Sequence, residues 1–255
     1  MGLLSSFFRK KKDEEDLPSI DLSKYIKADM HSHILPGIDD GARDLDTSIE
    51  LIEGLVQLGF SQLLCTPHVM TDFYRNSTDT IKKNLYLLRN ELDKRNINIH
   101  IDASAEYYFD EELVKRLKNR DILSFGKENY LLFEFSYYNE HQRIFEIITD
   151  MIELGYIPVL AHPERYPYYV MNQEKFDQIK SMGVKFQINL LSLSGNYGES
   201  AFRGSKYLID NHFVDFIGTD IHKKEHLVDL KKVLKNEHLH TLINSNNLLN
   251  SSLLE

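Results

Sequence analysis

The strongest constraint in this sequence is a sevenfold alternation of short hydrophobic runs with amphipathic helical segments. The runs are rich in Ile, Val, Leu, Phe and Tyr, as parallel strands buried on both faces are. They predict strands at 25–30, 62–66, 97–105, 130–135, 157–161, 185–190 and 214–218. Helices are predicted at 46–58, 78–95, 110–118, 141–154, 174–182 and 200–211, with a last helical stretch from near residue 224. The alternation has no break in composition, so it predicts right-handed βαβ units in one α/β domain.

Six of the seven predicted strands end on a side chain that can bind a metal ion. The carboxyl ends of the strands meet at one rim in a closed parallel barrel, whereas an open sheet concentrates its ligands at a single crossover point. Because almost every strand contributes here, the sequence predicts a seven-stranded TIM-like barrel with a metal site on its rim. The candidate ligands are His31, His33, one of Asp39 and Asp40, His68, Glu106, Glu134, His162, Asp220 and His222.

These candidates supply nitrogen and oxygen donors and no thiolate, a set that suits Mn²⁺, Fe²⁺, Zn²⁺ or Co²⁺. About nine ligands exceed the roughly four to six positions of one ion, so two or three ions are predicted. Several candidates have a simpler explanation when taken singly. His68 and His162 could merely end strands, and Glu106 or Asp220 could be a helix N-cap. Glu134 differs, because a carboxylate inside an apolar run is costly unless it is paired or bound to metal.

Arg165 follows His162 by three residues and offers a planar fork that can hold two oxygens of a phosphoryl group. The alternative is a salt bridge between Arg165 and the neighbouring Glu164. The sixth strand end carries amide and hydroxyl groups in place of a metal ligand. These groups are expected to bind substrate, to hydrogen-bond a ligating His, or to close the barrel rim. They belong to Gln187, Asn189 and Ser192.

The net charge, the single cysteine and the lack of known catalytic motifs exclude several partners and nucleophiles. A formal charge of −9 argues against nucleic acid as a partner. The lone Cys65 excludes a disulfide framework and fits a reducing, cytoplasmic location. The sequence has no Cys-x₅-Arg loop, no Gly-x-Ser-x-Gly elbow and no Gly-x₄-Gly-Lys phosphate loop. The remaining nucleophile is a hydroxide that bridges metal ions, because a bound divalent ion can lower the pKa of water to near neutrality.

Residues 1–20 are expected to form an arm that precedes one barrel domain at 21–255. No apolar run in the sequence approaches the roughly 20 residues that span a bilayer. The arm places Leu3, Leu4, Phe7 and Phe8 before a basic run at 9–12. Such a segment is either a frayed, solvated terminus or a peripheral contact with an anionic membrane surface.

The chain carries seven motifs between Asp29 and His222: HSHILPGIDDG at 31–41, TPH at 66–68, AEYY at 105–108, FEF at 133–135, AHPER at 161–165, QIN at 187–189 with SLSG at 192–195, and GTDIH at 218–222. Together they resemble the polymerase and histidinol phosphatase (PHP) superfamily. Within it, they are similar to the capsule-associated bacterial protein-tyrosine phosphatases. The first and fifth motifs are the specific ones, and the others are common to the wider superfamily.

The resemblance implies a distorted (β/α)₇ barrel and a trinuclear site that is usually supported by Mn²⁺, with Mg²⁺ a further usable ion. It implies that one ion is held by His31, His33, Glu106 and Asp220, that the other candidates complete the remaining sites, and that Arg165 binds the phosphoryl group. It also implies a phosphotyrosine protein as substrate, namely the Tyr-rich tail of a bacterial tyrosine kinase that controls polysaccharide export.

The sequence departs from some relatives beyond the last His, where they carry a second Arg. Here Lys223, Lys224 or His226 would take its place, or the second phosphate contact is missing. A lysine offers a point charge without the bidentate fork, so phosphate affinity and substrate selectivity depend on this difference.

Two other functions are open at this stage. One is a small-molecule phosphomonoesterase of the histidinol phosphatase type, which would use the same ions. The other is a non-catalytic metal-binding regulator of the polysaccharide machinery, although such a protein needs no phosphate-binding Arg165. In a tyrosine phosphatase, tyrosines after the strand ends would flank the substrate ring or pack the rim. They are Tyr107, Tyr108, Tyr137, Tyr138, Tyr166, Tyr168 and Tyr169.

Overall fold

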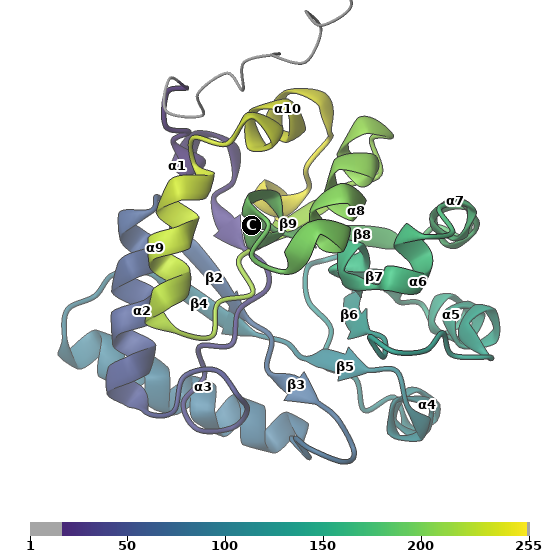
Figure 1. The fold of residues 1–255 in the computed structure, drawn as a ribbon. Coiled ribbons are helices and arrows are strands. Elements are labelled where there is room, and N and C mark those ends of the chain that lie inside the picture. The colour runs from purple at the N-terminus through teal and green to yellow at the C-terminus, as the bar shows by residue number, and fades with distance from the viewer. Residues whose placement is uncertain (1–16, 254–255) are drawn as a thin grey trace, which may run out of the picture.

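Every pairing between named strands is parallel in the computed structural model, which describes residues 17–253 (Figure 1). The strands are β1 (Ala28–Asp29), β2 (Gln62–Cys65), β3 (His68–Val69), β4 (His100–Ala103), β5 (Glu106–Tyr108), β6 (Tyr130–Glu134), β7 (Ile157–Ala161), β8 (Lys185–Asn189) and β9 (Phe216–Gly218). The helices are α1 (Leu22–Tyr25), α2 (Leu45–Gln57), α3 (Thr78–Lys94), α4 (Glu111–Asn119), α5 (Ile144–Glu153), α6 (Pro167–Val170), α7 (Glu174–Ser181), α8 (Gly198–Asp210), α9 (Lys224–Val233) and α10 (Glu237–Ser245). Short 3₁₀ turns are η2 (Pro163–Arg165), η3 (Leu190–Ser194) and η4 (Asn250–Ser252).

The strands form two sheets, in the orders β1-β2-β4 and β3-β5-β6-β7-β8-β9. The chain runs from β2 into β3 across Thr66–Pro67 and from β4 into β5 across Ser104–Ala105, so each pair is one strand path with a short interruption. Pro67 explains the first interruption, because proline has no N–H to donate to a ladder. The two paths stay linked there, since Glu106 N–H donates to Pro67 O at 3.1 Å. The result is a curled parallel sheet in one mixed α/β domain, with helices such as α2, α3 and α5 outside it (Figure 1).

The helices begin and end close to the predicted residues. Asp44, Ser77 and Asp110 are N-caps whose side chains accept hydrogen bonds from N–H groups of the first turn. Gly59 and Gly155 follow α2 and α5 with φ of 103° and 90°, a left-handed conformation that glycine adopts without steric cost. Six helices are therefore confirmed, with ends shifted by at most three residues.

Three strand predictions were wrong in extent. The strand predicted at 214–218 begins only at Phe216. The predicted strand at 25–30 is reduced to Ala28–Asp29, and its first residue, Tyr25, belongs instead to helix α1, which Asp21 caps by accepting the N–H of Ser23 at 3.2 Å. The predicted strand at 97–105 begins only at His100 and continues past its break to Tyr108. The turns η2 and η3 and the short helix α6 were not predicted.

The interior of the curled sheet has its own small core. Successive residues of one strand point to opposite faces, so Leu131 joins the large outer core with the helices while Leu132 joins the inner cluster. The inner cluster combines residues of β2, β6, β7 and β9 with Met30 beside β1. Side chains from strands far apart in sequence thus meet beneath the strand ends that carry the candidate ligands.

The ends of β1 and β9 lie side by side, between the two sheets. Ser32 and Ile221 form a parallel bridge, and Asp220 N–H donates to His31 O at 2.8 Å. Gly218 permits this approach, since a Cβ there would lie 2.6 Å from the Cβ of His31. The first and last strand ends are therefore held within bonding distance of each other.

Residues 1–16 of the predicted arm lie outside the described residues, and with them the candidate membrane contacts Leu3, Leu4, Phe7, Phe8 and 9–12. Ile20 is buried, and its N–H donates to Leu234 O at 2.8 Å, so the packed domain includes a residue before the predicted boundary of 21. Across 17–253, no helix is long and apolar enough to cross a membrane.

Candidate metal centre

The predicted ligands come together at the carboxyl ends of the strands. His31 and His33 follow β1, His68 opens β3, Glu106 opens β5, Glu134 ends β6, His162 follows β7, and Asp220 and His222 follow β9. Their donor atoms form four overlapping groups in which all atoms lie within 4.8 Å of one another. The groups are His33, Asp40, His68 and His222; His31, His33 and Asp220; His31, Glu106 and His162; and His68, Glu106 and Glu134.

Glu106 occupies the centre of this arrangement. Its Oε1 lies 3.0 Å from His162 Nε2, and its Oε2 lies 3.2 Å from His31 Nε2 and 3.1 Å from His68 Nδ1. The explanation of Glu106 or Asp220 as an N-cap is wrong, because Asp110 caps α4 and α9 follows Lys223. A fully buried carboxylate in contact with three imidazoles needs positive charge beside it.

The donor geometry fits a divalent cation. His31 Nε2 and His33 Nε2 face each other at 3.2 Å and lie 3.5 and 3.3 Å from Asp220 Oδ1. Two imidazole nitrogens cannot both direct an N–H into the same small gap, but both can direct a lone pair there. His68 Nδ1 is buried 3.1 Å from Glu106 and from Glu134, yet it has no hydrogen-bond partner within the described chain. Nitrogen and oxygen donors of this kind suit first-row divalent ions.

Asp39 and Asp40 occupy different positions in the cluster. Asp39 Oδ2 accepts hydrogen bonds from His33 Nδ1 at 2.8 Å and from His68 N–H at 3.2 Å. It therefore fixes the ring of His33 with Nε2 directed toward Asp220. Asp40 Oδ1 instead lies 3.6 Å from His68 Nε2 and 3.5 Å from His222 Nε2, within the donor group.

Gly41 allows the Asp39–Asp40 loop to pack against His33. A Cβ at position 41 would lie 1.9 Å from the carbonyl oxygen of His33, too close for any other residue. The N–H of Gly41 donates to Asp39 Oδ1 at 3.0 Å. The loop is thus held by backbone contacts that keep both carboxylates at the histidines.

A chain of hydrogen bonds from β8 holds two of the candidate ligands. His31 Nδ1 lies 2.8 Å from Gln187 Oε1, Gln187 Nε2 donates to Asn189 Oδ1 at 2.8 Å, and Asn189 Nδ2 donates to Asp220 Oδ2 at 2.6 Å. The expectation that this polar set hydrogen-bonds a candidate His is confirmed for Gln187. Asn189 is fully buried behind Asp220, and its predicted contact with substrate stays a prediction.

Arg165 pairs with Asp220 rather than with Glu164, so the salt-bridge alternative was wrong. The buried Glu164 carboxylate accepts hydrogen bonds from Asn189 N–H at 2.9 Å and Ser192 Oγ at 2.6 Å. Arg165 Nη1 donates to Asp220 Oδ2 at 3.1 Å, and its side chain is only 22% exposed. Its Cζ lies 4.7 Å from the ring centre of Tyr137 and 4.1 Å from that of Tyr197. The guanidinium is thus held by one carboxylate and two aromatic rings.

Two of the candidate ligands have an unusual backbone. His162 and Asp220 adopt φ of 35° and 51°, in the left-handed region that non-glycine residues rarely occupy. Such a conformation costs on the order of 1–3 kcal/mol and persists only where the surrounding structure enforces it. Both residues follow a strand at the rim, so the strained backbone directs their side chains into the cluster.

Burial and neighbouring charges shift the pKa values of the ionisable groups in the cluster. Burial raises the pKa of Glu106 and of Asp220, but His31 and further histidines hold both values well below the usual range. Burial lowers the pKa of His33, yet Asp39, Asp220 and Glu106 raise it well above its usual value. The two carboxylates therefore stay ionised and favour positive charge beside them.

A cavity of about 570 Å³ opens over the cluster. Lys223 and His226 line it with Arg165, whereas Lys224 pairs with Glu50.

The aromatic wall of this cavity contains three of the predicted tyrosines. Of the others, Tyr107, Tyr166 and Tyr169 are buried in the core, and Tyr168 is not among the lining residues. The other half of the wall was not predicted, and it comes from the loop after His68 and the Gly-rich loop after 194. The aromatic residues of the wall are Phe73, Tyr74, Tyr108, Tyr137, Tyr138 and Tyr197.

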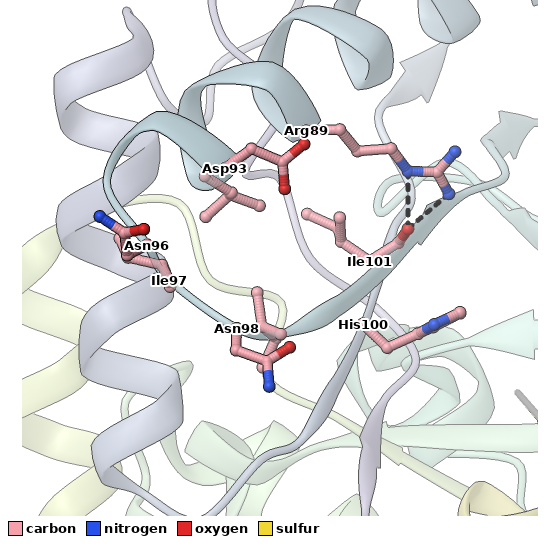
Figure 2. Close-up of a pocket in the computed structure, with 9 residues that line it drawn as sticks. Arg89, Asp93, Asn96, Ile97, Asn98, His100 and Ile101 are labelled. Carbon is pink, nitrogen blue, oxygen red and sulfur yellow. Dashed lines mark hydrogen bonds between the residues drawn. The ribbon is translucent and has the colours of Figure 1, made fainter.

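A second cavity, of about 630 Å³, lies beside the end of α3 and β4 (Figure 2). Its cationic residue Arg89 donates hydrogen bonds to the carbonyl oxygen of Ile101 at 3.1 and 2.6 Å, as the dashed lines in Figure 2 show. The predicted ligands do not line it. The candidate metal ligands therefore lie at the strand ends and not in this cavity.

Residues 27–241 match a model of the family described as "Capsular polysaccharide synthesis, CpsB/CapC". The chain is 31% identical over 194 residues to the tyrosine-protein phosphatase YwqE of Bacillus subtilis (strain 168), with 76% of each chain covered. It is 29% identical over 199 residues to the tyrosine-protein phosphatase CpsB of Streptococcus agalactiae, which covers 76% of this chain and 82% of CpsB. It also matches a solved structure described as "Crystal structures of YwqE from Bacillus subtilis and CpsB from Streptococcus pneumoniae, unique metal-dependent tyrosine phosphatases". That match has a TM-score of 0.76 and 27% identity, and it covers 87% of this chain and 96% of the other.

Proposed function

Because this chain belongs to the CpsB/CapC family of capsular polysaccharide synthesis, we propose that it is a metal-dependent protein-tyrosine phosphatase. The observation that carries the proposal is one cavity in which clustered histidines and carboxylates lie beside Arg165 and an aromatic wall. Metal ions and a guanidinium suit a phosphoryl group, and aromatic rings suit the phenyl ring that bears it.

The residues at the strand ends would hold two or three divalent ions, with Mn²⁺ as the preferred ion and Fe, Zn, Co or Mg as others that the donors accept. One ion would bind His31, His33, Glu106 and Asp220, and the others Asp40, His68, Glu134, His162 and His222. Asp40 is preferred over Asp39, because Asp39 already accepts hydrogen bonds from His33 and from backbone N–H groups. Bound ions would supply positive charge for the phosphoryl oxygens and an acidified water as nucleophile.

The remaining residues of the cavity would orient the substrate. Arg165 would bind non-bridging phosphoryl oxygens with the N–H groups that Asp220 leaves free. Lys223 and His226 would add donors at the side of the cavity where relatives carry a second Arg. Tyr137, which stacks on His162 with ring centres 5.8 Å apart, would contact the phenyl ring. Each of these groups acts by binding or orientation, which is what phosphoryl transfer chiefly requires of a protein.

We further propose that the curled sheet closes into a distorted (β/α)₇ barrel within one domain. Three observations support closure: β2 and β4 continue directly into β3 and β5, the ends of β1 and β9 bridge through Ser32 and Ile221, and strands far apart in sequence share an inner core. If β2 with β3 and β4 with β5 are each counted as one strand, the nine strands of residues 17–253 become seven, and these would form the ring. A ring of this kind would explain why every strand end but one contributes a candidate ligand.

The proposed substrate is a phosphotyrosine protein, and the proposed partner is the Tyr-rich tail of a bacterial tyrosine kinase that controls capsular polysaccharide. The similarity to proteins named tyrosine-protein phosphatases and the capsule family support this choice. The formal charge of −9 gives no support to a nucleic-acid partner. A small-molecule phosphatase of the histidinol phosphate type is the second candidate, because the same ions and Arg165 would serve it.

Turnover in the presence of Mn²⁺ separates these candidates. We expect hydrolysis of a phosphotyrosine peptide with a kcat/KM well above that for histidinol phosphate, because the cavity presents six aromatic side chains to the substrate. A higher kcat/KM for histidinol phosphate would favour the metabolite phosphatase. Turnover of neither compound by the metal-loaded protein would favour the non-catalytic regulator and contradict the proposed phosphatase.

A further inference from the structure

Two large aromatic side chains remain exposed at the mouth of the candidate active site. Phe73 is 75% exposed and Tyr138 is 88% exposed, and both line the cavity that contains the histidine cluster. A single exposed apolar residue is ordinary on a protein surface. Two that line one cavity, together with Tyr74, Tyr108 and Tyr137, place aromatic side chains both at its exposed edge and beside the candidate metal centre.

The segment that carries Phe73 is held firmly in place. Met70 and Tyr74 exchange backbone hydrogen bonds of 2.9 and 3.0 Å, which close a tight turn. Thr71 donates to Asp110 through its N–H at 3.1 Å and its hydroxyl at 2.6 Å, and Arg75 Nε donates to Thr71 O at 2.7 Å. Phe73 is therefore exposed on an anchored turn, so little conformational entropy is lost when a partner contacts it.

The rings are arranged in order of depth. Tyr74 stacks on His68 with ring centres 5.5 Å apart and an interplanar angle of 14°, and the Phe73 ring lies 6.5 Å from that of Tyr74. Phe73 is thus one ring further from the histidines than Tyr74. A phosphotyrosine with its phosphoryl group at the histidines would place its phenyl ring near the inner rings, and its neighbouring residues near the outer ones.

The segment that carries Tyr138 is also held by hydrogen bonds. Tyr138 N–H donates to Ser136 Oγ at 3.2 Å, and Ser136 O accepts the hydroxyl of Tyr168 at 2.7 Å. Tyr137, the residue before it, contacts Arg165 and stacks on His162. The chain therefore passes directly from Tyr137, beside Arg165 and His162, to the exposed Tyr138.

We propose that Phe73 and Tyr138 are a docking surface for apolar residues that flank the phosphotyrosine of a peptide substrate. This inference rests on the proposed function and adds a sequence preference to it: peptides with Leu or Phe beside the phosphotyrosine are better substrates than peptides with Gly there. Aromatic side chains in such positions provide large contact area with few rotatable bonds, as in many peptide-binding sites.

The test compares two phosphotyrosine peptides that differ only in their flanking residues, Leu against Gly, with the Mn²⁺-loaded full chain. We expect wild type to prefer the Leu-flanked peptide by roughly 5- to 30-fold in kcat/KM, mainly through KM. Phe73→Ala and Tyr138→Ala should each move this ratio toward one, and Phe73→Tyr should keep most of it. Tyr86→Ala is the matched control, because Tyr86 is 65% exposed on α3 and does not line the cavity.

The outcomes separate this inference from the proposed function. Hydrolysis of both peptides with equal kcat/KM in wild type, or a ratio that neither alanine variant changes, overturns the docking surface and leaves the phosphatase in place. An altered oligomeric state of Phe73→Ala with an unchanged ratio assigns the surface to contacts between copies and also overturns it. Hydrolysis of neither peptide contradicts the proposed function itself.

Discussion

Arg165→Lys is expected to lower kcat/KM for a phosphotyrosine peptide by roughly 10- to 1000-fold, which corresponds to about 1.4–4 kcal/mol of lost transition-state stabilisation. The substitution keeps the positive charge but removes the planar fork that can bind two phosphoryl oxygens. It also removes the flat group that contacts Tyr137 and Tyr197 while Nη1 binds Asp220. Steady-state kinetics on a phosphotyrosine peptide measure the loss, and metal content should stay at the wild-type value because Arg165 is not a candidate ligand.

The double change Lys223→Ala/Lys224→Ala belongs in the same series. Lys223 lines the cavity, whereas Lys224 pairs with Glu50, so we attribute any loss in the double variant to Lys223. If Lys223 takes the place of the second Arg of some relatives, its removal should raise KM and deepen the defect of Arg165→Lys. Near-wild-type kinetics for Arg165→Lys would show that this guanidinium does not bind the phosphoryl group.

We expect Asp220→Ala to lose bound metal and turnover together. Asp220 Oδ1 faces His31 and His33, and Oδ2 accepts hydrogen bonds from Asn189 and Arg165. Truncation of Asp220 should therefore disturb the candidate metal ligands and also the position of Arg165. We expect at least one ion per chain to be lost and kcat to fall by more than roughly 100-fold, because even residues that only support a ligand cost 10- to 100-fold when removed. Elemental analysis and kinetics on the same preparation measure the two effects.

Two variants control for loss of folding and for loss of charge. Asp102→Ala removes a carboxylate that is half exposed and paired with Arg89 near the second cavity, so it should leave metal content and turnover unchanged. Asp220→Asn retains an oxygen that can accept from Arg165 but loses the negative charge, so it should still lose metal. Wild-type metal content in both Asp220 variants would show that this residue is not a ligand.

The strand ends could be predicted because their signal is local. A hydrophobic run followed by His or a carboxylate indicates a buried strand and a polar side chain at its carboxyl end. The carboxyl ends of parallel strands meet at one rim, so His68, Glu134 and His162 could be predicted to lie there. Glycine stop signals such as Gly59 likewise located helix ends. The strand preference of Tyr25 was misleading, because a local cap at Asp21 starts a helix that includes this residue.

Contacts between distant residues could not be predicted. The partner of Arg165 is Asp220, 55 positions away, whereas its sequence neighbour Glu164 turns into the core toward Ser192. Asp39 and Asp40 are adjacent and chemically identical, so only the orientation of the loop distinguishes the one that holds His33 from the one among the donors. Tyr197 was missed because it lies in a Gly-rich loop without strand or helix periodicity, and only the tertiary fold brings it to Arg165.

Metal removal followed by Mn²⁺ addition tests the metal-dependent phosphatase most directly. The chain is stripped with a chelator, and hydrolysis of a phosphotyrosine peptide is followed before and after Mn²⁺ is returned, with bound metal counted by elemental analysis. We expect activity to disappear with the metal and to return as two or three ions bind per chain, while thiol alkylation has no effect because Cys65 is fully buried. Full activity of the metal-free protein would contradict the account, as would recovery without bound metal.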